Sequence, residues 1–436
     1  MSCPRLISGP GEPQPVQNLF NSDADRKGSE QVHLDQGPST RLGPVTDRVT
    51  GVTLTGHSTR RSTVPDEQAT DLDASTPERR TLDDRRQAVV NLWDFLVKGG
   101  LADQARTPSQ IIDSGRTREL HRYEPKEGVE TNGIPVLLVP PLGSQAACFD
   151  LRPGLSLAED LVKKGRPTYL VDYGPLKGED RALGVEHFIN DVLPPAIRAV
   201  SEDAGGQPVH LVGWCMGGLL SLGTAAVHQD LPIQSVSMIA SPFDFSANPL
   251  LKPFQVLGKV TGGRILGSAL KAAGSIPAPL VSAGFKATAL PTYLKKPRTL
   301  WSRRDDREFL TQIQAVDHIM NNMLAYPGRA TLQVYQRLAL RNELASGQIQ
   351  GPNHLVDLAT VSVPVMNIAG TEDVLVPSKA AHHVGGLLAS SPDVRLPLAP
   401  GGHLGVLTGT RAPYSTWVLV HDFLSDHDEA HTHTAA

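Results

Sequence analysis

The chain has 436 residues, a net charge of −4 and a pI near 6.4, with 40% hydrophobic and 20% charged residues. This composition is typical of a globular protein and argues against a nucleic-acid binder with a broad basic surface. No run reaches the roughly 18 apolar residues of a transmembrane segment, and no apolar signal-peptide segment is visible. We therefore predict a cytoplasmic protein, a setting that suits three scattered cysteines.

The first 80 residues are rich in Ser, Thr, Pro, Asp, Arg and Gly and lack a periodic apolar pattern. Such a segment buries too little apolar surface to offset its chain entropy, so we predict a disordered extension over 1–80. A partner-binding or targeting arm is the alternative. Order is expected to begin near Leu82, where apolar residues recur at helical spacing until Gly99 and Gly100.

Farther along, the chain alternates between short apolar runs and helical stretches. Each apolar run is continuous, as in parallel strands that are covered on both faces. Strands that alternate with helices indicate a mostly parallel, doubly wound sheet. Strands are predicted at 134–139, 168–171, 209–212, 236–240 and 363–368, with helices at 183–200, 217–227 and 415–424.

The alternation stops between Phe245 and about Leu358, where the sequence is mainly helical. We interpret this stretch as a cap inserted after one strand and folded over the carboxyl edge of the sheet, where ligands bind in open α/β sheets. The predicted organisation is a core of 81–245 and 359–425, a helical cap of 246–358, and a disordered tail of 426–436.

The clearest motif surrounds Cys215, in Gly213-Trp214-Cys215-Met216-Gly217. A predicted strand leads into it and a predicted helix leaves it, which is the context of a nucleophile elbow. Glycine is needed on both flanks because side chains there would collide at the strained turn. The helix N-terminus favours a thiolate, and the Met216 N–H is a candidate oxyanion donor. The alternative is a buried structural cysteine.

A base and an acid should follow the nucleophile in that fold, with the acid first. His403 comes after a short strand, among glycines that let its ring cross a loop. Asp373 follows the strand at 363–368 and is the preferred acid, with Glu372 and Asp244 as alternatives. The competing interpretations are a helix N-cap for Asp373 and turn packing for His403.

These residues predict an α/β-hydrolase fold with an inserted helical cap and a Cys-His-Asp triad. His403 would take the thiol proton from Cys215 while Asp373 orients the imidazole. The second oxyanion donor is expected from the loop after the first predicted strand, at Leu142 or Gly143. This mechanism requires no metal or organic cofactor, and the substrate would be a compound with an acyl carbonyl.

The motifs extend beyond the elbow and resemble those of the poly(hydroxyalkanoate) synthases over roughly residues 107–424. The resemblance implies acyl-CoA thioester substrates and the same three triad residues, Cys215, Asp373 and His403. The matching segments are Pro140-Pro141, 149–157, Asp172-Tyr173-Gly174, the G-x-C-x-G-G motif through Gly218, 242–245, 326–347 and the G-G-H-x-G of His403.

Three departures from that family fall in the expected oxyanion loop and the cap. Leu142-Gly143-Ser144 stands where polymerising synthases have an asparagine, Tyr173 replaces a common tryptophan, and a cap tryptophan is missing around Asp317-His318. The departures weaken the case for polymerisation more than that for acyl transfer. Hydrolase- or lipase-type relatives of the synthases carry similar features.

Acyl transfer is favoured because a Cys nucleophile exchanges one thioester for another near energetic balance. A Cys-dependent esterase or lipase-like hydrolase is the first alternative. A non-catalytic protein of a polymer granule or lipid surface, using the apolar stretches 256–270 and 280–290, is the second. A homodimer, a partner synthase subunit and a granule-associated location all stay open. Basic residues near Trp301 either meet CoA phosphates or form a solvated face: Lys295, Lys296, Arg298, Arg303 and Arg304.

Overall fold

The computed structural model describes residues 81–428, except 98–99, 102, 104, 177, 265–266, 269, 271–273, 289 and 352–354. The predictions of disorder for 1–80 and for the end of the chain from 429 onward lie outside these residues. Helix α1 (Leu82–Val97) begins where the apolar periodicity predicts.

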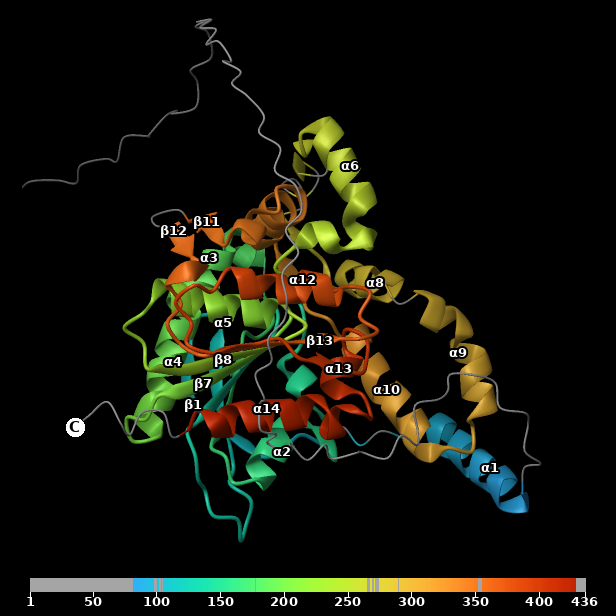
Figure 1. The fold of residues 1–436 in the computed structure, drawn as a ribbon. Helices are drawn as coiled ribbons and strands as arrows, with labels where there is room; N and C mark the ends of the chain where they lie inside the picture. The colour runs from blue at the N-terminus through green and yellow to red at the C-terminus, as the bar shows by residue number, and fades with distance from the viewer. Residues whose placement is uncertain are drawn as a thin grey trace, which may run out of the picture. The chain divides into compact units, whose positions relative to one another are not determined.

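Nine strands among the described residues form one sheet, in the order β1-β2-β6-β3-β7-β8-β13-β14, with β15 beside β13. Strands β7, β8 and β13 of this sheet are labelled in Figure 1. Strands β1 and β2 are antiparallel to each other, as are β2 and β6, and all the other pairs are parallel. The strands are β1 (Ser109–Gly115), β2 (Arg118–Tyr123), β3 (Val136–Val139), β6 (Thr168–Asp172), β7 (Val209–Trp214), β8 (Ile233–Ile239), β13 (Val365–Gly370), β14 (Val394–Arg395) and β15 (Leu398–Ala399).

Both faces of the sheet are covered, which explains why its central strands are apolar without interruption. Alternate residues of β3 show this directly, since Leu137 and Val139 join one core cluster while Val136 and Leu138 join the other. Helices α4 (Leu193–Asp203) and α5 (Met216–Val227) contribute to the first cluster. Helices α2 (Leu157–Lys163) and α14 (Thr416–Asp426) contribute to the second. The prediction of a mostly parallel, doubly wound sheet is confirmed.

The helix predicted at 183–200 is composite. It consists of α3 (Val185–His187), a π-helical segment η3 (Phe188–Val192) and α4. Pro194 and Pro195 lie in the first turn of α4. The π-helical η3 ends just before this pair, so the helical hydrogen-bond pattern changes at the point where proline nitrogens cannot donate.

The segment between β8 and β13 is mainly helical, as the sequence predicts. Its residues include two short antiparallel pairs, β9 (Ser275–Ile276) with β10 (Tyr326–Pro327) and β11 (Gln348–Gln350) with β12 (Leu355–Asp357). None of the described helices is long and apolar enough to cross a bilayer. The described helices of this cap include α6 (Lys252–Thr261), α8 (Ala278–Thr288), α9 (Leu290–Ser302), α10 (Arg307–Asn321), α11 (Gly328–Gln333) and the π-helical η6 (Val334–Leu340).

Two features differ from the sequence predictions. The β1–β2 hairpin was not predicted, because its exposed edge strand lacks a continuous apolar run. The boundary of the disordered tail at 426 is also wrong, since α14 reaches Asp426 and the Asp428 carboxylate binds Arg166 at 2.7 Å. The partner of Asp428 lies 262 residues earlier in the chain, so no local pattern reveals it.

Candidate active site

Cys215 lies at the sharp turn between β7 and α5, with φ 52° and ψ −117°. Positive φ is strained for a residue with a side chain, and it persists only where the surroundings hold it. Here Cys215 N donates to Ile239 O at 2.8 Å, and Ser241 Oγ donates to Cys215 O at 2.8 Å. The backbone is therefore held on both sides, and the thiol is only half-buried.

The glycines on either side of Cys215 are required by close backbone contacts. A Cβ on Gly213 would lie 2.5 Å from Gly218 N, and one on Gly217 would lie 2.0 Å from Val139 O. Both obstacles are backbone atoms of the sheet and the helix, so they cannot move aside at small cost. The steric reason given for the two flanking glycines is confirmed.

His403 and Asp373 are brought together at the same edge of the sheet. His403 Nδ1 donates to Asp373 Oδ2 at 2.8 Å, and the Asp373 side chain is fully buried. The other carboxylate oxygen accepts from Leu375 N at 2.9 Å and Val376 N at 2.7 Å. Asp373 thus caps a turn with one oxygen and binds the imidazole with the other. Glu372 N also donates to Gly401 O at 3.1 Å, which ties the acid loop to the histidine loop.

The two alternative acids point to other partners. Glu372 pairs with Arg411 at 2.6 Å, and its side chain is 54% exposed. Asp244 accepts from Asn342 Nδ2 at 2.9 Å and from Ser246 N at 2.9 Å. Of the three carboxylates considered from the sequence, Asp373 is the one that binds His403.

The imidazole of His403 interacts with the Cys215 thiol. Burial lowers the pKa of His403, but the negative charges of Cys215 and Asp373 outweigh it and raise the pKa to about 10. His403 Nε2 is buried and makes no hydrogen bond to a described nitrogen or oxygen. The arrangement therefore favours the protonated form of the His403 imidazole.

Trp214 supports this imidazole, a role that the sequence analysis missed. Its ring lies 5.3 Å from the His403 ring, between centroids, and its Nε1 donates to His403 O at 3.1 Å. Trp214 occupies the variable position of the G-x-C-x-G motif. In the sequence, the one local indication of this role was a large aromatic residue directly before the candidate nucleophile.

The loop after β3 lies at the carboxyl edge from which Cys215 also emerges, because β3 and β7 are parallel neighbours. Leu142 is buried, and Gly143 has φ +82°, a conformation that favours glycine. Tyr173 Oη donates to Pro140 O at 3.1 Å and Leu324 N donates to Gly143 O at 2.8 Å. Met216 begins α5, so its N–H is one of the helix's free donors.

Residues 134–410 match the sequence model of the alpha/beta hydrolase fold family. This chain belongs to the α/β-hydrolase family. It is 27% identical over 326 residues to the poly(3-hydroxyalkanoate) polymerase subunit PhaC of Allochromatium vinosum. The matched region covers 73% of this chain and 88% of that subunit. It is 26% identical over 314 residues to the PhaC subunit of Synechocystis sp., covering 69% and 79%.

These relatives confirm the resemblance that the motifs indicate, and they support an enzyme. Among solved structures, a soluble variant of monoglyceride lipase from Saccharomyces cerevisiae is similar with a TM-score of 0.48 and 16% identity, over 75% of this chain and 97% of that one.

The two cysteines that the structure describes in this α/β hydrolase differ in burial. The Cys148 thiol is fully buried, and burial raises its pKa well above the ordinary value. A thiol in such a setting is unreactive. Cys215, by contrast, is half-buried and next to an imidazole. The geometry thus separates a structural cysteine from a candidate nucleophile.

Three of the five basic cap residues have local partners. These local partners favour the interpretation that the three residues belong to a solvated face. Contact of Lys295 and Arg298 with CoA phosphates stays a prediction. The partners are Asp317 for Lys296, Asp306 for Arg303 at 2.7 Å, and the Trp301 ring for Arg304 at 4.6 Å.

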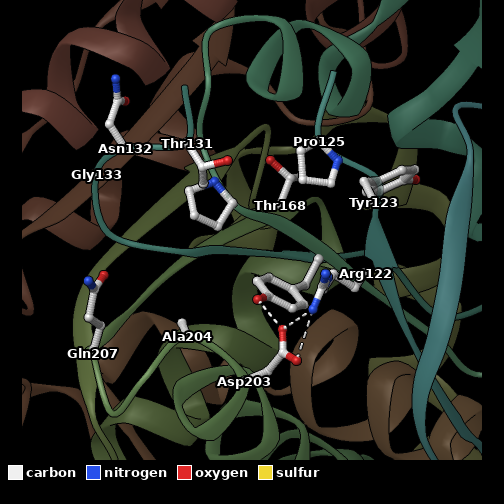
Figure 2. Close-up of a pocket in the computed structure, with 12 residues that line it drawn as sticks. Arg122, Tyr123, Pro125, Thr131, Asn132, Gly133, Thr168, Asp203, Ala204 and Gln207 are labelled. Atoms are coloured by element: carbon white, nitrogen blue, oxygen red, sulfur yellow. Dashed lines mark hydrogen bonds and ion pairs between the residues drawn. The ribbon is translucent and has the colours of Figure 1, made fainter. Parts of the chain in front are cut away.

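A cavity of about 380 Å³ lies at the opposite edge of the sheet, near the amino ends of β3 and β6 (Figure 2). Asp203 and Arg122 are the charged residues of its lining, and Asp203 accepts from Tyr169 Oη at 2.6 Å and from Arg122 Nη1 at 3.2 Å. These polar groups satisfy one another, and the lining contains no cysteine, serine or histidine. The cavity is therefore not a candidate for the acyl chemistry of the elbow.

Proposed function

We propose that this α/β hydrolase is an acyltransferase resembling the poly(3-hydroxyalkanoate) polymerases. It forms an acyl-enzyme on Cys215 from a hydroxyacyl-CoA thioester and passes the acyl group to a hydroxyl. The observation that carries the proposal is the charge arrangement around His403, whose imidazole is bound to the buried Asp373 at 2.8 Å and coupled to the Cys215 thiol.

In the first half-reaction, the Cys215 thiolate attacks the thioester carbon, and the carbonyl electrons move to oxygen. The N–H of Met216 and a donor of the loop at Leu142 or Gly143 stabilise that oxyanion. Collapse breaks the bond between carbon and the CoA sulfur. The CoA thiolate takes the proton from the His403 imidazolium and leaves as a thiol, which restores neutral His403.

In the second half-reaction, neutral His403 takes a proton from the acceptor hydroxyl as its oxygen attacks the acyl carbon. The Cys215 thiolate then leaves, and the ion pair with His403 is restored. The hydroxyl of a second hydroxyacyl group gives chain growth, the reaction named for the relatives. Water in the same position gives hydrolysis.

A Cys-dependent esterase is the second candidate, and a specific feature favours it. Leu142-Gly143-Ser144 and Tyr173 depart from the synthase pattern within the oxyanion loop and the residue that holds it. These differences change the surroundings of the acyl carbonyl and leave Cys215, Asp373 and His403 untouched. Because this loop lies beside the acyl carbonyl in both half-reactions, the differences bear on acylation as well as on the choice between a hydroxyl and water as the acceptor.

The test is incubation of the purified full chain with 3-hydroxybutyryl-CoA and, separately, with a short p-nitrophenyl ester. Free CoA, released acid and polymer are measured, and the acyl adduct is located by mass spectrometry of the peptide containing Cys215. We expect CoA release and a Cys215 adduct, both lost in Cys215→Ala. Ester hydrolysis with little CoA release would support the esterase, and unchanged turnover by Cys215→Ala would exclude both candidates.

A further inference from the structure

Tyr326 in β10 brings the cap against the proposed oxyanion loop. A Cβ added to Gly143 would lie 2.5 Å from Cδ2 and Cε2 of the Tyr326 ring, so the ring occupies the space that a side chain at 143 would need. Two residues earlier, Leu324 N donates to Gly143 O at 2.8 Å. The cap is thus fastened to this glycine by a hydrogen bond and by an aromatic ring.

The same tyrosine reaches the surroundings of the nucleophile. Its ring packs against both core clusters of the sheet, one of which also contacts Cys215. Burial raises the pKa of Tyr326 far above its ordinary value, and the charge of Cys215 raises it further. The phenol therefore keeps its proton at neutral pH and is available as a hydrogen-bond donor.

The hydroxyl of Tyr326 differs from those of two other tyrosines that pack in the core. Tyr169 Oη donates to Asp203 at 2.6 Å, and Tyr173 Oη donates to Pro140 O at 3.1 Å. No described residue accepts a hydrogen bond from Tyr326 Oη. Tyr326 is half-buried, so a ligand that enters the site can supply the acceptor for this hydroxyl.

We infer that Tyr326 is a further residue of the acyl-transfer site. Its hydroxyl donates to the oxygen of the acyl group on Cys215, while its ring holds the turn at Gly143. The inference rests on the proposed function, because it needs an acyl group at Cys215. It assigns two separable contributions, a hydrogen bond formed with substrate and a packing contact formed without it.

The experiment compares Tyr326→Phe, which keeps the ring, with Tyr326→Leu, which loses it. Tyr326→Phe should lower kcat by on the order of 10²-fold with little change in KM, because a donor to the oxyanion acts mainly in the transition state. Tyr326→Leu should show the same loss and, in addition, a lower Tm. Tyr335→Phe, a buried tyrosine of η6 in the same cap, is the matched control and should keep its kcat and Tm.

Each other outcome decides against a stated part of the inference. Full kcat in Tyr326→Phe together with a loss in Tyr326→Leu would reduce Tyr326 to a packing residue. A rise in KM alone in Tyr326→Phe would place the hydrogen bond in the ground state and overturn the transition-state role. If Cys215→Ala retained activity, the proposed function would fail first. A normal Cys215 adduct with unaffected Tyr326→Phe would overturn the inference alone.

Discussion

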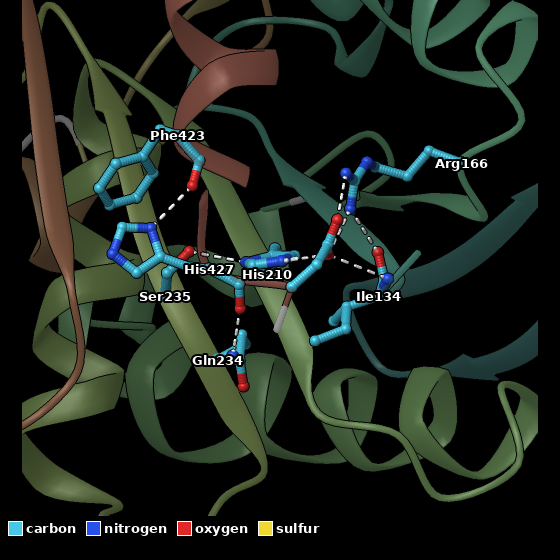
Figure 3. A network of polar contacts seen from close by, with 8 residues as sticks. Ile134, Arg166, His210, Gln234, Ser235, Phe423 and His427 are labelled. Carbon is cyan, nitrogen blue, oxygen red and sulfur yellow. Dashed lines mark hydrogen bonds and ion pairs between the residues drawn. The ribbon is translucent and has the colours of Figure 1, made fainter. Parts of the chain in front are cut away.

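Two imidazoles in this protein each bind a carboxylate on one side and approach a hydroxyl or thiol on the other. His403 joins Asp373 to Cys215 at the carboxyl edge of the sheet. His210 lies 3.2 Å from Asp428 Oδ1 through Nε2 and 2.7 Å from Ser235 Oγ through Nδ1, at the amino edge (Figure 3). By residue type alone, the second set is a Ser-His-Asp triad.

The surroundings of the two sets differ in access and in charge. His210 and Ser235 are completely buried, so no substrate reaches them. Asp428 is neutralised by Arg166, with contacts of 2.9 and 2.7 Å, and burial lowers the pKa of His210 below its ordinary value. The pKa of His403 is raised instead. Residue types alone therefore do not identify a triad. The nucleophile must be accessible to substrate, and the carboxylate must not be neutralised by a cation.

The set around His210 serves to fasten distant parts of the chain. Arg166 Nη1 donates to Ile134 O at 3.1 Å, and Ile134 N donates to Asp428 Oδ1 at 3.2 Å (Figure 3). Ile134 precedes β3, Arg166 precedes β6, and Asp428 follows α14. The network therefore anchors the C-terminal helix to the sheet, away from the proposed chemistry.

The largest expected difference between the two sets is in their nucleophile positions. Cys215→Ala should lower turnover of 3-hydroxybutyryl-CoA by on the order of 10⁵-fold or more, because the acyl-enzyme cannot form. Ser235→Ala should keep turnover within about twofold, since removal of one buried hydroxyl costs stability rather than rate. CoA release measures both, and comparable losses in the two variants would undo the distinction.

The carboxylates should separate next. Asp373→Asn should lower kcat by roughly 10³–10⁴-fold, because the imidazole loses its orienting charge. Asp428→Asn should instead keep kcat and lower the free energy of unfolding by about 3 kcal/mol, since buried Arg166 loses its partner. Urea titration and steady-state kinetics on both variants provide the measurement. A large rate loss in Asp428→Asn with unchanged stability would contradict the comparison.

The two imidazoles should also respond to pH in opposite directions. His210 has a lowered pKa when folded, so the unfolded chain binds the extra proton and stability falls as pH drops below about 6.5. Asp428, whose pKa is also lowered, adds a contribution that is present above pH 4 and is lost as pH falls further. The contribution of His403 is fully present below about pH 6.5 and is lost as pH rises toward its folded pKa of about 10.

NMR titration of the histidine Cε1–H signals checks this contrast. The His403 signal should keep its protonated shift to about pH 10, and Cys215→Ala should move its midpoint downward because a negative charge is removed. His210 should stay neutral below its ordinary midpoint in both proteins. An unchanged His403 midpoint in Cys215→Ala would show that the thiol is not coupled to the imidazole.

The smallest effect is expected at Asp244, the carboxylate bound by Asn342 and Ser246 in the cap. Asp244→Asn weakens charged hydrogen bonds at a half-buried position, so it should lower stability by about 1 kcal/mol and change kcat by less than threefold. Steady-state kinetics beside Asp373→Asn decides the assignment. If Asp244→Asn caused the larger rate loss, Asp373 would not be the acid.

Local patterns determined the elbow and the central sheet of this protein. A strand, a turn with glycine on both flanks and a helix are formed by consecutive residues, so Cys215 was identifiable within a short motif. The strands β3, β7, β8 and β13 are buried on both faces, so consecutive residues in each are buried. The burial is therefore visible in the sequence as a continuous run. The candidate base could be named because glycines surround His403.

Only the tertiary structure decided which distant groups meet. Asp373 was one of three carboxylates until the loops after β13 and β15 placed it on His403, thirty residues away. The positions of Trp214 against His403 and Tyr326 against Gly143, and the anchoring of Asp428 by Arg166, likewise join segments far apart in sequence. Such contacts depend on chain crossings and burial, and a periodic pattern carries no information about either.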